Sequence, residues 1–254
     1  MIVILDTETT GLDTKSCEII EIATCPLGDE EVQSILIRPV NPIPNEVIEI
    51  TGITNEMVAS EPTLEEALPK LLEMLHLDED PIFVAHNAPF DMGMVLHNLM
   101  RVGFEQSDLT FMDKSRWLCT NRLSKITYGA DPKCRSTKLT EMQKFCNLHV
   151  PENNIAHRAG ADVLTCMRLL EHFLEKYQDL SIEELNELCW GPIQYTRFPF
   201  GMHKGKLLER IPTDYFIWLF ENINSLNPED PNFDADLYGS IENEINRRIA
   251  AMAF

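Results

Sequence analysis

The feature that most constrains this chain is a short apolar run that leads straight into two carboxylates. Residues 1–5 read Met-Ile-Val-Ile-Leu, which is typical of a buried strand, and Asp6 and Glu8 follow. Side chains two positions apart on a strand point to the same face, so the two carboxylates converge. Negative charge at the edge of an apolar core is costly unless cations lie between the carboxylates. The sequence therefore predicts a metal site at the end of its first strand.

The apolar patterning along the chain predicts an α/β fold. The expected strands are 2–6, 18–25, 31–38, 81–85 and 110–113. The expected helices are 63–76, 89–101 and 158–176, with two more in the basic stretch before Lys144. A Pro- and Asn-rich loop is expected at 38–45. Strands first and helices alternating afterwards indicate a mixed sheet flanked by helices.

The character of the chain changes after about Tyr177, and this change predicts two domains. Residues 1–178 are expected to form the sheet domain and residues 192–254 a small α+β domain. The second part is expected to contain a capped helix that begins at Ser181, a strand and Gly-rich turn at 195–206, and helices at 211–222 and 235–250.

The segment at 195–206 combines basic and aromatic side chains. A small basic cluster close to aromatic residues predicts contact with nucleic acid outside the metal site. The cluster consists of Arg197, His203, Lys204 and Lys206. The Gly-rich turn lacks the spacer and the Ser or Thr of a P-loop. Helical spacing in the following segment predicts a packing face formed by Tyr215, Phe216 and Trp218.

The charge of the chain limits how it can bind a polyanion. The formal net charge is −20, which argues against non-specific binding to nucleic acid. Between Lys114 and Lys144, however, eight Lys or Arg face only two acidic residues. This stretch is either a solvated helical face or a track for phosphates beside the metal site.

Composition also bears on where the chain is expected to work. The seven cysteines are scattered and odd in number, which indicates a reducing cytoplasm rather than a disulfide framework or a zinc site. No apolar run approaches the length of a membrane span, and no basic region precedes Ile2 as in a signal peptide. A cytoplasmic protein without membrane partners is therefore expected.

Two further acids complete the predicted metal site. Asp91 lies in the first turns of the helix expected at 89–101, and Asp162 in those of the helix expected at 158–176. Strand ends and helix starts are where α/β sheets keep their sites. Four carboxylates can bind two divalent cations about 3.5–4 Å apart, an arrangement suited to phosphodiester cleavage. Hard oxygen ligands favour magnesium or manganese over zinc.

His157 precedes Asp162 by five residues. On one regular helix this offset turns the two side chains well apart, so His157 is expected to project from the preceding loop. A histidine near a metal-bound water is a natural general base, whereas a lone loop histidine is more often inert. His86 directly follows an apolar strand and is expected to be structural, with Asn87 fixing the turn before Asp91.

Three segments together resemble the exonuclease motifs of the histidine-bearing DnaQ-like 3′→5′ exonucleases. They are Asp-Thr-Glu-Thr-Thr-Gly-Leu from residue 6, His-Asn-Ala-Pro-Phe-Asp from residue 86, and His-Arg-Ala-Gly-Ala-Asp from residue 157. The resemblance covers residues 1–176, and nothing in the motifs departs from the family's pattern.

This resemblance implies an RNase H-like fold and release of nucleoside 5′-monophosphates from a 3′ end. It implies that two Mg2+ ions, which Mn2+ can replace, are held by Asp6, Glu8, Asp91 and Asp162. It further implies that His157 deprotonates the water, with Glu8 contributing to catalysis as well as to metal binding.

The resemblance also implies where substrate binds. Thr9, Thr10 and Leu12 are expected to meet the terminal nucleotide, with Leu12 against its base; the alternative is a turn and a core leucine. Phe90 and Trp117 are candidates for stacking on bases, although Phe90 is better explained as a core aromatic. The remaining predicted substrate-binding residues are Asn87, Arg135 and Lys138.

The C-terminal part narrows the choice of substrate. Residues 198–206, with Ile211-Pro and the aromatic run at 215–220, are similar to the C-terminal segment of bacterial exodeoxyribonuclease X. This favours DNA 3′ ends over RNA and a role in DNA repair. The alternatives are an exoribonuclease that trims RNA 3′ ends and a non-catalytic nucleic-acid-binding module on the same fold. A phosphatase of the Asp-x-Asp-x-Thr class is disfavoured, because the second acid here is glutamate.

Overall fold

The chain divides into two compact units. In the computed structural model, the described residues are 1–254 except 30, 106–108, 110–111, 151–158, 231–232 and 253–254. The first unit comprises Met1–Asn121 with Lys138–Cys189, and the second comprises Arg122–Thr137 with Trp190–Phe254. The sequence did not predict that 122–137 would group with the C-terminal residues. The proposed functional domains 1–178 and 192–254 stay a prediction.

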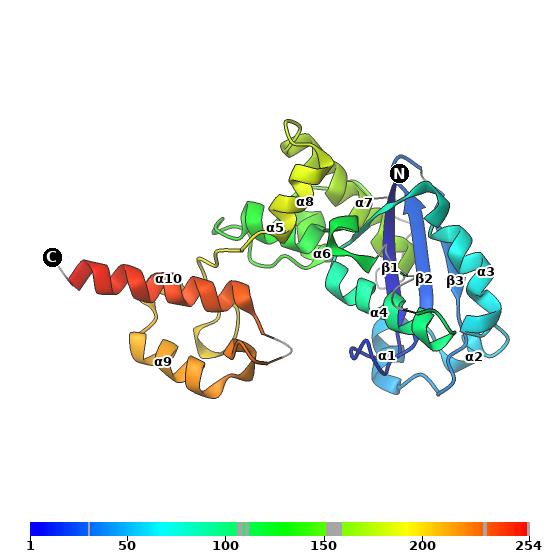
Figure 1. The fold of residues 1–254 in the computed structure, drawn as a ribbon, viewed down its shortest axis with the longest axis horizontal. Helices are drawn as coiled ribbons and strands as arrows, with labels where there is room; N and C mark the ends of the chain where they lie inside the picture. The colour runs from blue at the N-terminus through cyan, green and yellow to red at the C-terminus, as the bar shows by residue number, and fades with distance from the viewer. Residues whose placement is uncertain (30, 106–108, 110–111, 151–158, 231–232, 253–254) are drawn as a thin grey trace. The chain divides into compact units, whose positions relative to one another are not determined.

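The first unit is built on a mixed sheet that has five strands among the described residues (Figure 1). The strands are β1 (Ile2–Thr9), β2 (Ile19–Pro26), β3 (Gln33–Leu36), β4 (Ile82–Ala85) and β5 (Trp117–Cys119). Their order is β3-β2-β1-β4-β5. The first three are antiparallel neighbours, whereas β4 and β5 run parallel to β1. The predicted sheet of mixed direction is confirmed.

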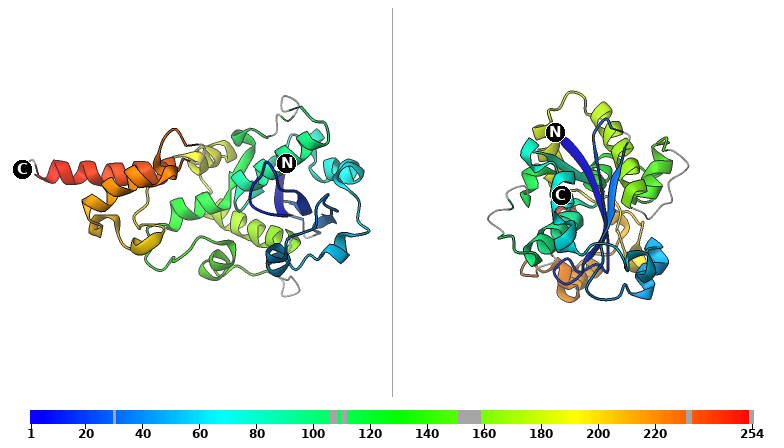
Figure 2. Two further views of the ribbon diagram at one scale, coloured as in Figure 1. Left: turned by 90° about the horizontal axis from the view of Figure 1, so that it is seen from below. Right: turned by 90° about the vertical axis from the view of Figure 1, so that its right-hand side faces the viewer.

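Helices cover both faces of this sheet (Figure 2). The helices of the first unit are α1 (Asn45–Thr51), α2 (Asn55–Val58), α3 (Leu64–Met74), α4 (Ala88–Arg101), α6 (Leu139–Phe145), α7 (Ala159–Lys176) and α8 (Ile182–Trp190), whose last residue belongs to the second unit. Helix α5 (Thr120–Tyr128) begins in the first unit and continues in the second, which also contains α9 (Thr213–Asn222) and α10 (Ala235–Met252). In β2, all residues from Ile19 to Cys25 are buried, as expected for a strand covered on both sides. Helix α7 packs on β1 and β2.

Helix starts follow the capping signals in the sequence. The Ser181 hydroxyl accepts a hydrogen bond from the Glu184 N–H at 3.2 Å, and the Glu184 carboxylate accepts one from the Ser181 N–H at 2.8 Å. This capping box, predicted for α8, is confirmed. Thr63 and Glu66 form the same reciprocal pair before α3. The short helices α1 and α2, which follow the Pro- and Asn-rich loop, were not predicted.

The fifth strand lies at Trp117–Cys119, whereas the sequence analysis expected it at 110–113. Residues 110 and 111 lie outside the described part of the chain. Asp113 instead caps a short helical turn, because its carboxylate accepts the Ser115 N–H at 2.8 Å. Trp117 is fully buried and packs against Phe83 with ring centroids 5.0 Å apart. The idea that Trp117 stacks on bases is therefore wrong.

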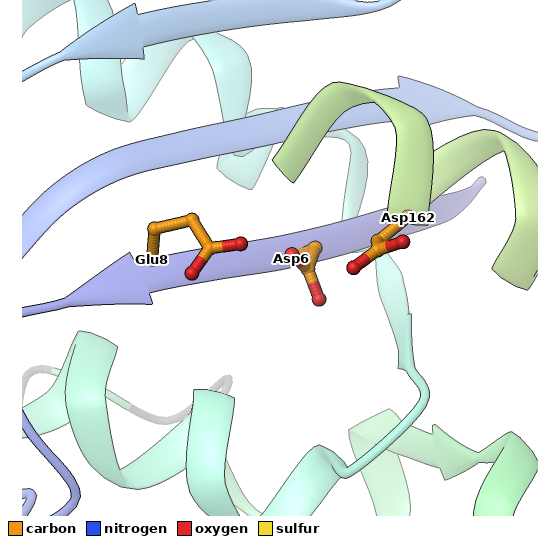
Figure 3. Close-up of side chains that lie close together, drawn as sticks. All are labelled: Asp6, Glu8 and Asp162. Atoms are coloured by element: carbon orange, nitrogen blue, oxygen red, sulfur yellow. The ribbon is translucent and has the colours of Figure 1, made fainter. Parts of the chain in front are cut away.

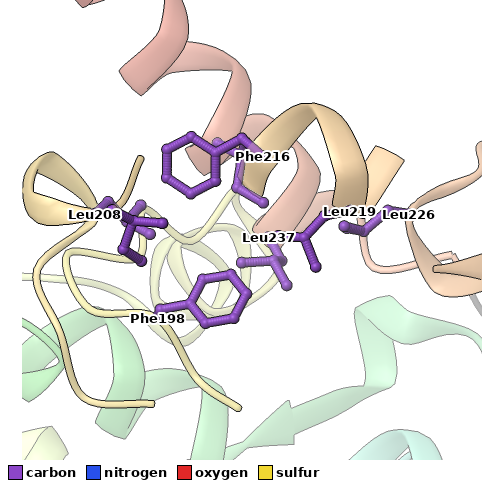
Figure 4. Packing of buried hydrophobic residues seen from close by; sticks show 8 residues of the cluster. Phe198, Leu208, Phe216, Leu219, Leu226 and Leu237 are labelled. Carbon is purple, nitrogen blue, oxygen red and sulfur yellow. The ribbon is translucent and has the colours of Figure 1, made fainter. Parts of the chain in front are cut away.

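The second unit has its own apolar core between α9 and α10 (Figure 4). Its buried residues are Phe198, Leu208, Ile211, Phe216, Leu219, Leu226, Leu237 and Ile241. The segment 122–137 is joined to it through Arg122, which contacts the Asp236 carboxylate at 2.7 Å and donates to the Gly191 carbonyl at 2.7 Å. The strand expected within 195–206 is reduced to one isolated bridge between Arg197 and Leu207.

Among the helices that the structure describes, none is both long enough and apolar enough to cross a membrane.

Candidate active site

The candidate site lies where β1 extends past its parallel neighbour. β1 pairs with β4 only from Ile2 to Ile4, but it pairs with β2 as far as Thr9. The β-branched Thr7 and Thr9 continue the strand, which was expected to end at Asp6. Asp6 and Glu8 therefore lie within the strand rather than in a loop after it, just before its pairing with β2 shifts register between Glu8 and Thr9. Their spacing is fixed by the backbone of the strand.

Three carboxylates meet on this extension. Asp6 and Glu8 from β1 and Asp162 from the first turn of α7 each place an oxygen within 4.8 Å of the others (Figure 3). All three side chains are half-buried. Ala23 lies opposite Asp6 on β2, and this small side chain leaves room beside the carboxylate. The convergence of acids from β1 and α7 is what the sequence predicted.

The fourth predicted acid, Asp91, lies in the first turn of α4 and is buried, with 3% of its surface exposed. Its Oδ1 accepts two hydrogen bonds from Thr7, one from the backbone N–H at 3.1 Å and one from the hydroxyl at 2.8 Å. Thr7 sits between Asp6 and Glu8, on the part of β1 that β4 does not reach. The same short strand segment thus carries two acids and anchors a third.

The electrostatics of this cluster are unfavourable without a cation. Burial raises the pKa of Asp6 well above its usual value, and repulsion from Asp91, Asp162, Glu8 and Glu21 raises it further. Burial also raises the pKa of Asp91, although the hydrogen bonds from Thr7 oppose this effect. A set of hard oxygen donors that repel one another is the chemistry that suits a divalent metal ion. The residues present therefore fit a divalent metal.

Glu21 supplies one more carboxylate to this region, and it was not predicted from the sequence. It lies on β2 directly opposite Glu8 and is only 3% exposed. Its Oε1 accepts the Ser34 hydroxyl at 2.8 Å, and its Oε2 accepts the backbone N–H of Ala159 at 3.3 Å. Glu21 thereby ties β3 and the start of α7, the helix that carries Asp162, to the centre of the sheet. An acid inside the apolar run Ile-Ile-Glu-Ile was the available signal.

The loop after β1 combines two tethered threonines with an exposed leucine. The Thr9 hydroxyl donates to the Gly11 carbonyl at 2.7 Å, and the Thr10 hydroxyl accepts the Glu18 N–H at 2.9 Å. Both therefore shape the turn. Leu12 is 87% exposed, so the alternative of a core leucine is wrong.

The second motif is held in place by His86. Its Nδ1 lies 2.9 Å from the Thr120 hydroxyl and its Nε2 lies 3.2 Å from the Asn121 amide, which agrees with the expected structural role. Asn87 is exposed at the start of α4, and Phe90 is half-buried.

The other predicted residues are placed as follows. Arg135 and Lys138 are exposed and belong to different units. His157 lies outside the described residues.

The chain is similar in sequence and in fold to known exonucleases. The chain is 30% identical to exodeoxyribonuclease 10 of Escherichia coli strain K12 over 236 residues, covering 90% of the chain and 94% of that protein. It is 31% identical over 204 residues to a PolC-type DNA polymerase III of Clostridium perfringens, covering 78% of the chain but only 13% of the polymerase. Among solved structures, exonuclease X in complex with 5′ overhanging duplex DNA aligns with a TM-score of 0.55 and 26% identity. That alignment covers 74% of this chain and 99% of the other.

These similarities confirm the fold and family predicted from the three motifs, an RNase H-like sheet of the DnaQ-like exonuclease kind. The profile of the exonuclease family RNase_T matches residues 3–170, which include the four acids of the candidate site. The chain therefore belongs to the RNase_T exonuclease family.

Proposed function

We propose that this protein is a divalent-metal-dependent 3′→5′ exonuclease that releases nucleoside 5′-monophosphates from DNA 3′ ends. The observation that carries the proposal is the convergence of Asp6, Glu8 and Asp162, with buried Asp91 anchored beside them, in a chain of this family. The charge of such a cluster must be relieved by protonation or by bound cations, and a set of hard oxygen donors suits divalent cations.

We propose Asp6, Glu8, Asp91 and Asp162 as the residues that hold the metal, with two Mg2+ ions as the native occupants and Mn2+ able to replace them. A bound pair of divalent cations would supply charge neutralisation and polarisation of the phosphodiester. The rigid setting of these carboxylates on β1, α4 and α7 keeps the donor atoms in place without reorganisation.

In this mechanism His157 acts as the general base. Its imidazole takes a proton from the attacking water, whose oxygen bonds to the phosphorus of the terminal nucleotide. The bond from phosphorus to the 3′ oxygen of the preceding nucleotide then breaks, and this oxygen takes a proton from solvent. The nucleoside 5′-monophosphate leaves, and the shortened strand ends in a 3′ hydroxyl. The position of His157, five residues before Asp162 in the third motif, supports this role.

The terminal nucleotide is proposed to lie beside the loop that follows β1. Thr9 and Thr10 shape that loop, and Leu12 exposes an apolar surface suited to the face of a base. Asn87 and Phe90, at the start of α4, would complete this contact, while Arg135 and Lys138 would contact phosphates.

DNA is proposed as the substrate, and DNA repair as the setting. Support comes from similarity to exodeoxyribonuclease 10 over most of both chains and to exonuclease X bound to duplex DNA. RNA 3′-end trimming would use the same carboxylates, and a non-catalytic binding module could keep the fold without turnover. These two outcomes are what an assay must separate from the proposal.

The test is a time course on a 5′-labelled single-stranded DNA oligomer, with a matching RNA and an EDTA control. We expect a ladder that shrinks from the 3′ end of the DNA in Mg2+ and is absent in EDTA. Asp162→Asn and His157→Ala should each abolish it. Asp179→Asn, an exposed acid beyond the other end of α7, is the matched control and should cleave normally. A ladder on RNA alone would move the activity to RNA, and binding without any ladder would leave only a binding module.

A further inference from the structure

The second unit exposes a set of stacked rings on α9. Trp218 is 47% exposed, although the sequence predicted that it would pack. Its ring lies nearly parallel to that of Tyr215, with centroids 5.7 Å apart and an angle of 21° between the planes. His203 meets the other end of this pair edge-on, 4.5 Å from the Tyr215 ring. We call Trp218, Tyr215 and His203 the ring cluster.

Tyr215 packs against the core of the second unit, but the exposure of Trp218 is not a by-product of that packing. Phe216 and Leu219, on the other side of the same helix, are fully buried and fill the core of the unit. Trp218 could therefore be polar without loss to that core. The last turn of the helix is closed by the Asn222 amide, which donates to the Trp218 carbonyl at 2.8 Å. An exposed tryptophan that stacks on a second ring offers a large amphipathic contact surface, which is why tryptophan and tyrosine are enriched at interfaces.

A Gly-dependent turn brings His203 and two lysines to the rings. Gly201 and Gly205 both have positive φ, at 62° and 79°, a conformation that favours glycine. The Gly205 N–H donates to the Phe198 carbonyl at 2.8 Å, which fixes the turn to the core. Lys206 Nζ lies 3.1 Å from His203 Nδ1, and Lys204 is exposed on the same turn.

The charge of this segment is opposite to that of the whole chain. Residues 195–206 contain three cationic side chains and no acidic one, in a protein of net charge −20. Two of the three, Lys204 and Lys206, are exposed, while Arg197 braces the turn by donating to the Gly205 carbonyl at 2.9 Å. The acids Asp214 and Glu221 are also exposed on α9, so the positive charge is confined to the turn. The surface therefore offers a π-face next to local positive charge.

We infer that the ring cluster, with Lys204 and Lys206, binds single-stranded nucleic acid: a base stacks on Trp218, and the adjoining phosphates contact the lysines. Aromatic stacking beside cations is how proteins hold single strands without reading their sequence. The inference rests on the proposed function for the identity of the ligand. It adds a second binding site, formed by the second unit alone, that takes part in no catalytic step.

The test measures binding of the full-length protein to a fluorescein-labelled dT oligomer by anisotropy, in EDTA so that no cleavage occurs. We expect Trp218→Ala to weaken affinity about tenfold and Trp218→Phe to restore most of it, because a base stacks on either aromatic ring. Ile217→Ala is the matched control, since Ile217 is the neighbouring residue on α9 and is equally exposed, at 49%. It should bind normally. Changing Lys204 and Lys206 to Gln should weaken binding and reduce its salt dependence.

A second signal comes from the tryptophan itself. Stacking should quench its fluorescence on addition of dT, and Trp218→Phe should remove that change while binding persists. The other two tryptophans, buried Trp117 and half-buried Trp190, are present in both proteins, so a change that is lost in the variant is assigned to Trp218. Equal affinities for wild type, Trp218→Ala and Ile217→Ala would overturn the inference. Cleavage of a thymidine dinucleotide by Trp218→Ala keeps the two proposals apart. Normal cleavage with unchanged affinity would refute only the second binding site, whereas a wild-type protein that releases no nucleotide would refute the proposed function.

Discussion

At the scale of single residues, Thr7 is the link between the two acids of β1 and the acid of α4. Replacing it with valine keeps the volume of the side chain and removes only the hydroxyl bond to Asp91. We expect Thr7→Val to lose about 1 kcal/mol of stability and roughly tenfold in activity, because of the two Thr7 donors to Asp91 the backbone N–H alone remains.

Thr24 provides a control for this prediction within the same sheet. Its hydroxyl is buried and has no hydrogen-bond partner among the described residues. Thr24→Val should therefore be neutral or slightly stabilising, with normal activity. Urea unfolding measures the stability of both variants, and steady-state cleavage of DNA measures their activity. Equal behaviour of the two variants would show that the Thr7 hydroxyl does not position Asp91.

Glu21 is predicted to act on the metal site through the start of α7. In Glu21→Gln the negative charge is lost and the amide keeps one acceptor oxygen, so the carboxylate's two bonds survive only if the Ser34 hydroxyl turns to accept from the new NH2 group while the oxygen still accepts the Ala159 N–H. We expect the Mg2+ concentration for half-maximal activity to rise about tenfold or more. Ser34→Ala, which keeps the carboxylate and its bond to Ala159, should leave this concentration nearly unchanged. If Glu21→Gln lowers only the melting temperature, its role is purely structural.

The acids of the site were predictable from the sequence, but their surroundings were not. Asp6, Glu8, Asp91 and Asp162 are marked by local signals, namely an acid after an apolar strand or in the first turn of a helix. The role of Glu21 could not be predicted, because it depends on hydrogen bonds to Ser34 on β3 and Ala159 on α7, and Ala159 is distant in the sequence.

At the scale of secondary-structure elements, the carboxylate of Glu244 on α10 helps to connect α10 to α9 within the second unit. It accepts hydrogen bonds from Arg247 and Arg248 at 2.7–2.8 Å, and these bonds lower the pKa of Glu244 to about 2. Arg248 in turn donates to the Thr213 hydroxyl at 2.8 Å and to the Leu208 carbonyl at 2.9 Å. The carboxylate thus orients an arginine that connects α10 to the start of α9.

This link gives a defined pH dependence. Because the folded-state pKa is depressed, the stabilisation by Glu244 is fully present above its ordinary pKa of 4.5 and is lost as the pH falls toward about 2. We expect Glu244→Gln to destabilise the second unit by about 1–2 kcal/mol at pH 7, with the difference from wild type shrinking below pH 4.5. Thermal unfolding of both proteins between pH 7 and pH 3, followed by tryptophan fluorescence, measures it; the second unit contributes Trp190 and Trp218 to this signal. A difference that stays constant across this range would contradict the assignment.

Long periodic elements were predictable, and short ones that depend on their partners were not. Helices α3, α4 and α7 follow from apolar spacing, with boundaries close to those expected. The three-residue strand β5 is a strand because β4 pairs with it in parallel, and nothing local to Trp117 indicates this. The expected strand at 195–206 failed because its glycines turn the chain back on itself.

At the scale of the whole molecule, a charge of −20 must be reconciled with a polyanionic substrate. We predict that affinity for DNA depends on cations at the carboxylate cluster and on the basic stretch that contains Arg135 and Lys138. Removal of Mg2+ with EDTA should weaken binding of a DNA oligomer, and replacing both basic residues with alanine should weaken it further. Filter binding at several salt concentrations tests this. Affinity that is unchanged by chelation would refute this account of substrate capture.

The path of the chain through its two units has a practical consequence for truncation. The chain leaves the first unit after Asn121, returns at Lys138 and leaves again after Cys189, so the second unit is made from two separate pieces. The ion pair between Arg122 and Asp236 joins residues more than a hundred positions apart, so it can form only after Asp236 has been synthesised. Truncation after residue 189 would therefore not yield a compact first unit alone. It would leave 122–137 as an unsupported loop in the middle of the protein, a ready target for proteases.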